Sequence, residues 1–551
     1  MTATEQFEAP GPGMWNLDRS HFPGGTTPMS KWLMEGCAQG MRRAFEEIGM
    51  PAETLDVRFV NGFMYTRLRP LISPNRAATT LPPESVLKLV VRLHPGMRKR
   101  SKGAARAISE KPWLTVVNEW QQSIRPRLEA TNEELQSVDV EHLDDAALAS
   151  HIDRLMSYCR ENFELHFYLH TYDLGPIGFL LAECRRWGID APEVVPALSG
   201  ASPATSAPAR ILRELREIVV ASGTTPATLD DVRSISPEAA KLLDLYFARR
   251  GRMMVTRYDL DGRTLEEQPE VVLGALLSGR DGTADETYSA AVAARLRERV
   301  PADERALFDE RLADARATMD LRDDNGPNTV ELPVGILRYA LLEAGRRAVA
   351  AGRVSDARFT FDLEPGEVVS FVRDGVGPSG DELEARARRR HADALLTPPP
   401  VLGPAEMTPP LEVLSAPHQT FIAAVQIVLD HMGMTPADEP AAGRLRGAGV
   451  GTAPYRGTAR VDGDPEQALD AVNPGDVLVV RFTTPAYNTV LMIAGAVVTT
   501  EGALLSHAAV MARELGIPAV IGVEGALEEI PDGAEVEVDP VAGTVHVSVA
   551  H

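Results

Sequence analysis

One histidine of this chain stands where an expected strand should pass into an expected helix. His507 follows the apolar run AGAVVTT and begins the helical run HAAVMARELG. The residue before it, Ser506, is a favoured N-cap, and Gly516 with Pro518 is a typical helix end. We therefore predict that His507 lies in the first turn of a helix.

A histidine in this position is suited to accept a phosphoryl group. The free N–H groups and the positive dipole end of a helix N-terminus disfavour an imidazolium, which keeps the ring neutral and nucleophilic. The same helix end would hold the attached phosphate. The alternative, a tolerated polar residue with no catalytic role, is the commoner reading of a lone histidine. The residues that we expect to support the phosphate are Ser506, Thr500, Thr499 and Gly502.

The elements that must position these residues suggest a multidomain chain: a large, mainly α domain followed by a small α/β domain. Residues 1–395 are dominated by helical patterning, as in PVGILRYALLEAGRRAVAAG, and VRFVNGFMYTRL predicts a strand or hairpin turning at Gly62. Residues 396–445 are rich in Pro and Gly and predict a hinge with a short helix. Short β-rich runs from YRGTARV to GTVHVSV predict a compact domain over 446–551.

The totals exclude several classes of protein. The 551 residues carry a net charge of −22, which argues against a nucleic-acid-binding surface. The three cysteines lack the spacing of a zinc site or a disulfide framework, so we expect no metal site and a reducing cytoplasm. No stretch reaches the roughly 18 apolar residues of a membrane span, and no targeting segment is evident, so we expect no membrane partner.

The segment around His507 strongly resembles a known family. TTEGALLSHAAVMARELGIPAVIG is similar to the phosphohistidine segment of the phosphoenolpyruvate-utilising, swivelling-domain family, and GDVLVV and DGAEVEVDPVAGTVHV extend the resemblance. The resemblance implies that His507 is the phosphorylated residue. Many members have two glycines where this chain has Gly502 and Ala503, and we expect the extra methyl group to narrow the approach to the ring.

Two parts of the wider family are missing from the sequence. A pyruvate-binding β/α barrel takes roughly 250 residues, whereas only 523–551 follow the histidine segment, so we expect no pyruvate chemistry here. No GxxxxGK[ST] or GGK-like loop is present, and the last lysine is Lys241. The resemblance then implies that a separate ATP-grasp subunit supplies ATP and Mg²⁺, and that this chain alone binds neither.

The segment 13–395 resembles, more diffusely, the acceptor-binding part of rifampin phosphotransferase-like and phenylphosphate synthase-type enzymes. The resemblance is carried by MWNLDRSHFPGGTTPM, NGFMYTRL, RYDLDGRTLEEQPE and LLEAGRRAVAAGRVSDARFTFDLEPGEV. The first of these families has an Arg-x-x-x-Lys-x-Gln cluster that meets the phosphohistidine. In RDDNGPN, Arg322 is retained while Gly326 and Asn328 replace Lys and Gln, which argues against rifamycin as acceptor. Arg322 would neutralise the transferring phosphoryl group, or would be a solvated arginine.

Transfer to a hydroxyl also needs a base and a pocket. In FELHFYLHTYD, His166 and His170 share a helix face near aromatic residues. His166 could be the base, half of a metal-binding pair, or a core histidine. His21 with Asp18 is a second acid–base pair, or part of a capped loop. The residues assigned to acceptor binding are Asp18, His170, Phe167 and Arg67.

These features predict the phosphohistidine and acceptor subunit of a two-component, ATP-dependent phosphotransferase. The expected acceptor is a phenol or alkylphenol, because the predicted pocket is aromatic with few charges. A rifamycin-type antibiotic phosphotransferase component and a non-catalytic phosphocarrier or regulatory protein remain alternatives. RLHPGMRKRSKGAAR is locally basic, and it is either a solvated loop or a docking surface for an acidic partner or for ATP phosphates.

Overall fold

The computed structural model describes residues 7–18, 21–22, 24–277, 286–432, 445–461, 465–483 and 487–547. The chain forms two compact units, each built from separate stretches of sequence. Unit 1 comprises Met1–Asp173, Arg257–Gly262 and Asn325–Ala423. Unit 2 comprises Leu174–Thr256, Arg263–Asp324 and Ala424–His551.

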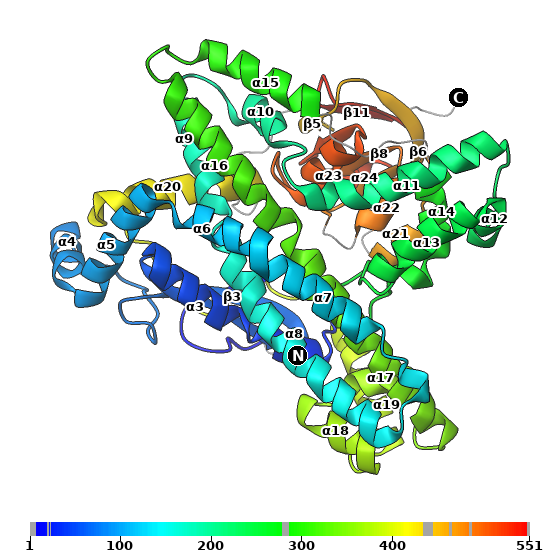
Figure 1. The fold of residues 1–551 in the computed structure, drawn as a ribbon. Helices are drawn as coiled ribbons and strands as arrows, with labels where there is room; N and C mark the ends of the chain where they lie inside the picture. Colours follow the sequence, from blue (N-terminus) through cyan, green and yellow to red (C-terminus); the bar gives the residue numbers. More distant parts are fainter. Residues whose placement is uncertain are drawn as a thin grey trace. The chain divides into compact units, whose positions relative to one another are not determined.

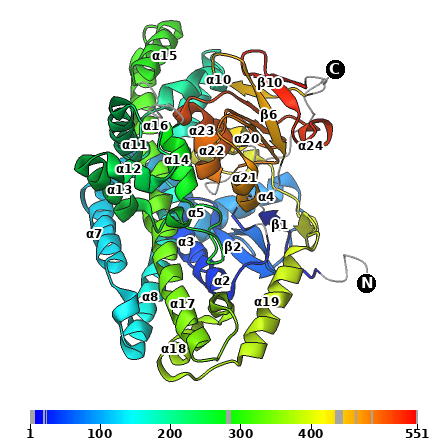
Figure 2. The same ribbon diagram turned by 90° about the vertical axis from the view of Figure 1, so that its right-hand side faces the viewer.

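Unit 1 is built around one long helix, α8 (Asp145–His170), which packs against α3, α17 and α18 (Figure 2). Asp144 caps its N-terminus by accepting a hydrogen bond from the backbone N–H of Ala147. The helix prediction for PVGILRYALLEAGRRAVAAG is confirmed. The helices of unit 1 are α2 (Pro28–Met34), α3 (Cys37–Ile48), α4 (Glu84–Leu93), α5 (Pro95–Glu110), α6 (Pro112–Glu119), α7 (Arg125–Gln136), α8, α17 (Leu332–Ala350), α18 (Pro365–Asp374) and α19 (Gly380–Ala394), with shorter turns η1 (Trp120–Ile124), η2 (Val140–His142), η5 (Pro327–Glu331), η6 (Ala357–Asp362) and η7 (Leu411–Val413).

A four-stranded antiparallel sheet completes unit 1, in the order β2-β3-β1-β4. The predicted hairpin is confirmed: β2 (Ala52–Val60) and β3 (Phe63–Pro70) are joined at Asn61 and Gly62, whose φ angles are 48° and 77°. Two left-handed residues in succession are typical of a tight hairpin turn. The other strands are β1 (Trp15–Asp18) and β4 (Val401–Leu402), which pair with each other.

Unit 2 contains the seven-stranded mixed sheet of the predicted α/β domain, in the order β11-β10-β6-β7-β8-β9-β5. Neighbours from β6 to β9 are parallel, and β5, β10 and β11 pair antiparallel. The predicted β-rich runs all form strands. These are β5 (Ala448–Val450), β6 (Tyr455–Val461), β7 (Val477–Val480), β8 (Ala496–Thr499), β9 (Ala519–Ile521), β10 (Glu535–Asp539) and β11 (Thr544–Val547).

The alternation of side chains explains how this sheet is covered. Leu478, Val480 and Val497 point to a cluster with α22 (Asn488–Ile493) and α23 (His507–Leu515), whereas Val477 and Val498 point to a second cluster with α24 (Ala526–Glu529) and β10. Figure 1 shows the ribbons of these helices beside the sheet. Both faces of the parallel strands are therefore buried. The helices are α21 (Pro465–Ala471), α22 (Asn488–Ile493), α23 (His507–Leu515) and α24 (Ala526–Glu529).

Unit 2 also holds a set of helices from the middle of the chain. They are α9 (Leu174–Arg186), α10 (Ala191–Val194), α11 (Pro203–Ser222), α12 (Leu229–Ile235), α13 (Pro237–Arg250), α14 (Pro269–Leu277), α15 (Glu286–Arg299) and α16 (Arg305–Asp323), with turns η3 (Val195–Leu198) and η4 (Leu265–Glu267). Among the described residues, no helix combines the length and the apolar character that a membrane crossing requires.

The predicted hinge, 396–445, contains regular structure. β4 lies in it, and the expected short helix is α20 (Ala416–Met432), which has 17 residues. Residues 433–444 of the hinge lie outside the described residues. The domain boundaries at 395 and 445 stay predictions.

Candidate functional site

His507 is the first residue of α23, as predicted. Ser506 has the extended backbone of an N-cap, but its side chain does not cap the helix. Instead the buried Oγ of Ser506 has no hydrogen-bond partner among the described residues. Gly516, with φ 64°, ends the helix in the left-handed conformation expected of it.

Both ring nitrogens of His507 are hydrogen-bonded. Nδ1 lies 2.8 Å from Oγ1 of Thr483, and Nε2 lies 2.8 Å from Oδ1 of Asn488. A carbonyl oxygen only accepts, so in this arrangement Nε2–H donates to Asn488 and Nδ1 accepts from the Thr483 hydroxyl. The ring is therefore held in one plane as a single neutral tautomer.

The parallel pairing of β7 and β8 explains how Thr483 meets His507. Thr483 follows the carboxyl end of β7, and His507 lies beyond the carboxyl end of β8, so both arise at the same edge of the sheet. Functional groups of α/β sheets collect at this edge. Thr483 and Asn488 were not predicted as site residues, although their place after a buried parallel strand was a usable signal.

The ring of His507 is uncharged at neutral pH. Burial lowers the pKa of His507 to about 3, and the positive charge of Arg322 acts in the same direction. The prediction of a neutral ring rested on the helix dipole, whereas burial is the larger cause here. The lone pair of this histidine is therefore available over the whole physiological pH range.

Arg322 approaches the same loop from α16. One of its Nη atoms donates to the backbone oxygen of Leu505 at 3.4 Å. The backbone N–H of Leu505 donates to the oxygen of His431 at 2.6 Å, and its side chain packs with Phe308 and Val428. Helices α16 and α20 thus hold the loop before His507 in place. The two predicted site residues Arg322 and His507 therefore lie in one site.

The remaining predicted phosphate-supporting residues lie at the end of β8 and in the turn between β8 and α23. The Thr499 hydroxyl donates to the backbone oxygen of Glu501 at 2.8 Å, and the Thr500 hydroxyl donates to that of Arg481 at 3.2 Å. Gly502 has a φ of 108°, and a methyl group there would lie 3.0 Å from the Ser506 Oγ. In this state only Ser506 has an uncommitted hydroxyl for a phosphoryl oxygen.

The predicted histidines of α8 lie in unit 1. The rings of His166 and His170 are edge to face with centroids 4.5 Å apart. The Thr329 hydroxyl donates to the backbone oxygen of Asn325, so Nδ1–H of His166, at 3.1 Å, donates to the Thr329 oxygen. Burial lowers the pKa of His166 well below its ordinary value, and the charges of His170 and His21 add to this. His166 is therefore neutral, with its lone pair on Nε2.

His21 and Asp18 form the pair that the sequence predicted. Nδ1 of His21 lies 2.9 Å from Oδ2 of Asp18, and its ring stacks on Tyr258 with centroids 6.0 Å apart. Burial lowers the pKa of His21, but the Asp18 carboxylate raises it by more, so the net pKa lies above its ordinary value. The imidazole is 44 % exposed.

Tyr258 was not predicted as a site residue, although it lies in the RYDLDGRTLEEQPE motif. Burial raises its pKa well above the ordinary value, and the carboxylates of Glu331 and Asp18 add to this, so the phenol keeps its proton. The neighbouring Asp259 fixes the segment, because its carboxylate accepts from the backbone N–H of Thr27 at 2.9 Å and from the Thr27 and Ser30 hydroxyls.

The other predicted acceptor residues differ in their surroundings. Phe167 packs edge-on to His166, with centroids 5.0 Å apart. Arg67 is buried and ion-paired with Glu406, and it also donates to two backbone oxygens, so these contacts account for its burial without a ligand. Asp173 accepts from His170 at 2.9 Å. The backbone oxygen of Asn328 accepts a hydrogen bond from the side-chain amide of Asn132 at 3.0 Å.

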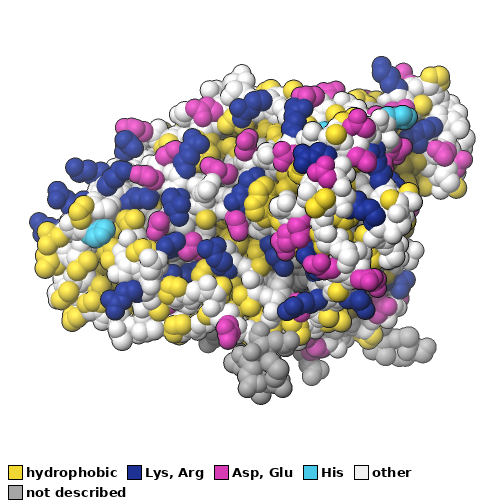
Figure 3. Space-filling model, turned by 90° about the horizontal axis from the view of Figure 1, so that it is seen from below, with side chains coloured by type: hydrophobic (Ala, Val, Ile, Leu, Met, Phe, Trp, Pro, Cys, Tyr) yellow, Lys and Arg dark blue, Asp and Glu magenta, His cyan; other side chains and the backbone are white. Residues whose placement is uncertain are grey.

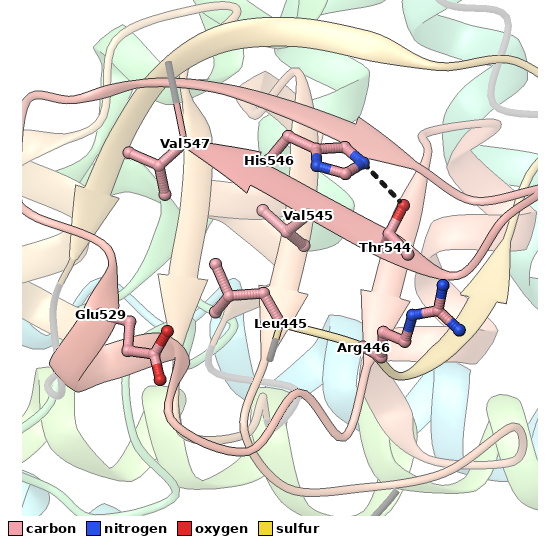
Figure 4. A pocket seen from close by; sticks show the side chains of 7 residues that line it. All are labelled: Leu445, Arg446, Glu529, Thr544, Val545, His546 and Val547. Atoms are coloured by element: carbon pink, nitrogen blue, oxygen red, sulfur yellow. Dashed lines mark hydrogen bonds between the residues drawn. The ribbon is translucent and has the colours of Figure 1, made fainter. Parts of the chain in front are cut away.

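Two further features bear on where a cofactor could bind. Within the described ranges, no group of three or more His, Cys, Asp or Glu side chains is placed to hold a metal ion. A hollow of about 410 Å³ lies beside β11, where Thr544 and His546 are hydrogen-bonded at 3.2 Å, and Arg446 and Glu529 are among the residues that line it (Figure 4). It contains none of the predicted site residues.

Comparison with known proteins agrees with the resemblance of the histidine region. Residues 472–543 match the family model of the PEP-utilising enzyme mobile domain. An uncharacterised protein of Mycobacterium tuberculosis is 45 % identical over 103 residues, which are 19 % of this chain. Phosphoenolpyruvate synthase of Aeropyrum pernix is 39 % identical over 102 residues (18 %), and rifampicin phosphotransferase of Streptomyces sviceus is 40 % identical over 111 residues (20 %). The chain spans 12 % of the length of each relative. The predicted resemblance to the PEP-utilising family is confirmed.

Proposed function

We propose that this chain is the phosphohistidine and acceptor subunit of a two-component phosphotransferase. The overall reaction is ATP plus an acceptor hydroxyl plus water, giving AMP, phosphate and the phosphorylated acceptor. A separate ATP-grasp subunit with Mg²⁺ places the β-phosphoryl group of ATP on His507. The observation that carries the proposal is a neutral, doubly hydrogen-bonded His507 at a helix N-terminus beside Arg322.

The residues around His507 suit both halves of the reaction. The nitrogen that attacks must first lose its hydrogen-bond partner, either Asn488 at Nε2 or Thr483 at Nδ1, while the other bond keeps the ring aligned. Nδ1 can attack directly with its lone pair, whereas Nε2 must first give up its proton; in either case the ring releases one proton, to solvent or to the donor. Arg322 then supplies the positive charge that phosphoryl transfer requires on the equatorial oxygens. The Ser506 hydroxyl gains an acceptor in the phosphate.

The acceptor side is assigned to unit 1. His21, oriented by Asp18, takes the proton of the acceptor hydroxyl, because its ring is exposed and its pKa is raised. Neutral His166 and protonated Tyr258 bind the acceptor oxygen through a lone pair and an O–H. The neighbouring aromatic rings favour a phenol or alkylphenol over a sugar. Transfer then requires unit 1 to bring the acceptor hydroxyl to the phosphorylated ring of His507 beside Arg322.

A direct test follows label from β-³²P-ATP in the presence of the separate ATP-grasp protein. Acid-labile label should appear on the wild-type chain, should be absent from His507→Ala, and should pass to a phenol. Label that persists in His507→Ala rules out this carrier. Label acquired without the second protein contradicts the two-component scheme.

Two alternatives are separated by the same assay. A rifamycin acceptor is favoured by the similarity to rifampicin phosphotransferase, which covers 20 % of this chain. Gly326 and Asn328, in place of lysine and glutamine, argue against it. Transfer to rifampicin but not to phenols would select it. A chain that is labelled yet passes phosphate to no small molecule would be a phosphocarrier.

A further inference from the structure

The helix α4 presents an apolar stripe to solvent. Val86, Leu89, Val90 and Leu93 follow the i, i+3, i+4, i+7 pattern of a single helix face. They are 44, 55, 38 and 62 % exposed, and no residue of α4 is buried. Single exposed apolar residues are ordinary, but four on one face form a patch of the kind that marks an interaction site.

A basic region adjoins this stripe. Residues 84–110 contain seven Lys or Arg and two Glu, whereas the whole chain has a net charge of −22. Figure 3 shows Lys and Arg gathered around hydrophobic side chains at its left end, where α4 and α5 lie in Figure 1. Arg98 and Lys102 of α5 are exposed and form no ion pair with the described residues. The stripe together with Arg98 and Lys102 is called the α4–α5 surface.

The chemistry of this surface selects one kind of occupant. An amphipathic helix with anchors at i, i+3, i+4 and i+7 is typical of helix-in-groove recognition between proteins. A second copy of the same surface would bring two basic regions together, which is unfavourable. Helices that lie in a lipid interface have a polar face rich in Lys and Arg, whereas on α4 Lys88 is ion-paired with Glu84 at 2.6 Å.

We infer that the α4–α5 surface docks the separate ATP-binding subunit, through an apolar groove on that subunit rimmed by Asp and Glu. This inference rests on the proposed function, which requires a second protein to phosphorylate His507. Complementary charge accelerates and orients such an encounter, and burial of the aliphatic stripe prolongs it.

The test measures the rate of His507 labelling against the concentration of this chain, with the ATP-grasp protein and β-³²P-ATP. One variant combines Leu89→Ser with Leu93→Ser, and the second combines Arg98→Glu with Lys102→Glu. All four side chains are exposed, so the fold is not at risk. The matched control is Val376→Ser with Leu395→Ser, which are 63 and 86 % exposed elsewhere in unit 1.

We expect each surface variant to raise the KM for this chain at least tenfold while kcat is unchanged and the control behaves as wild type. The charge variant should also lose the salt dependence of the wild-type KM. If the surface variants are labelled at His507 with the wild-type KM, the inference is overturned and the proposed function is left intact. Wild type that is never labelled contradicts the proposed function itself. Binding of the wild type, but not of the variants, to 3:1 POPC:POPG vesicles with an unchanged KM would also overturn it and reassign the surface to lipid.

Discussion

The Thr483 hydroxyl lies 2.8 Å from Nδ1 of His507, although 24 residues separate them. Together with the bond from Nε2–H to Asn488 Oδ1, the contact holds the ring in one orientation as a single tautomer. The contact also gives the buried hydroxyl of Thr483, at the edge of an apolar sheet, a hydrogen-bond partner.

Replacement of Thr483 by Val should therefore slow the phosphorylation of His507. The loss of one hydrogen bond corresponds to about 0.5–1.5 kcal/mol, or roughly a two- to tenfold lower rate. Val has nearly the same shape, so the fold should persist. Initial rates of labelling measure the effect, and Thr458→Val is the control because that hydroxyl donates to Glu535 at an exposed position of β6, outside the candidate site. Equal rates for both variants would contradict the role of Thr483.

Acid should destabilise the wild type partly through His507. Its pKa is about 3 in the folded chain and about 6.5 when unfolded. The unfolded chain thus binds the extra proton between these values, so the free energy of unfolding falls as the pH falls through this window. Urea unfolding from pH 7.5 to 4.5 should show a shallower fall for His507→Gln, by about 1 kcal/mol per pH unit below 6.5. The control is His142→Gln, because His142 is exposed, and it should keep the wild-type pH dependence. If His507→Gln also keeps the wild-type pH dependence of the free energy of unfolding, the assigned role of His507 is contradicted.

Replacement of Arg322 by Met should raise the pKa of His507, because one of the two causes of its depression is removed. Burial remains, so the pKa of His507 in this variant should lie above that of the wild type and still below 6.5. Ring ¹⁵N shifts of labelled histidine measure it. Transfer of the phosphoryl group to the acceptor should fall on the order of a hundredfold. Exposed Arg233, replaced by Met, should leave both quantities unchanged.

A methyl group at Gly502 should be poorly tolerated. Its φ of 108° is unfavourable for other residues, and the added carbon would lie 3.0 Å from Ser506 Oγ. Gly502→Ala should lower the free energy of unfolding by about 1–3 kcal/mol. Gly516 also has a left-handed φ, 64°, but there is open space around it. Gly516→Ala should therefore lower the free energy of unfolding by only about 1 kcal/mol. Thermal unfolding compares the two, and an equal loss would show that the contact with Ser506 is unimportant.

Asp18→Asn should lower the pKa of His21 and weaken it as a base. The limb of the pH–rate profile for transfer to a phenol should move to lower pH, and the rate at neutral pH should fall roughly ten- to hundredfold. Asp139 and His142 form a pair of the same i, i+3 spacing at 2.8 Å on an exposed surface. Asp139→Asn is thus a matched control, and a profile shifted equally by both substitutions would argue against His21.

The parts of the fold set by local pattern were predictable from sequence. The hairpin at Asn61 and Gly62, the helix start at His507 and the six strands from β6 to β11 each follow from alternation, turn residues or capping preferences. Strand β4 has two residues and forms only because β1, nearly 400 positions away, pairs with it. No local signal marks such a strand.

The site was predictable where its residues lie close in sequence and was missed where the sheet brings them together. Ser506 and His507 are adjacent, and Arg322 was assigned by resemblance. Asn488 and Thr483 depend on the order of β7 and β8, which hydrophobic pattern does not determine. Likewise Tyr258 meets His21 only because a six-residue segment of the middle of the chain joins unit 1.

The unpaired, buried hydroxyl of Ser506 affects how long His507 stays phosphorylated. A buried hydroxyl without a hydrogen-bond partner destabilises the unphosphorylated state by about 1–3 kcal/mol. Gaining a phosphate oxygen would relieve that deficit. Hydrolysis of phosphorylated His507 would therefore be slower than hydrolysis of free phosphoimidazole. The hydrogen bond from Ser506 would retain the phosphoryl group between its transfer from the donor and its transfer to the acceptor.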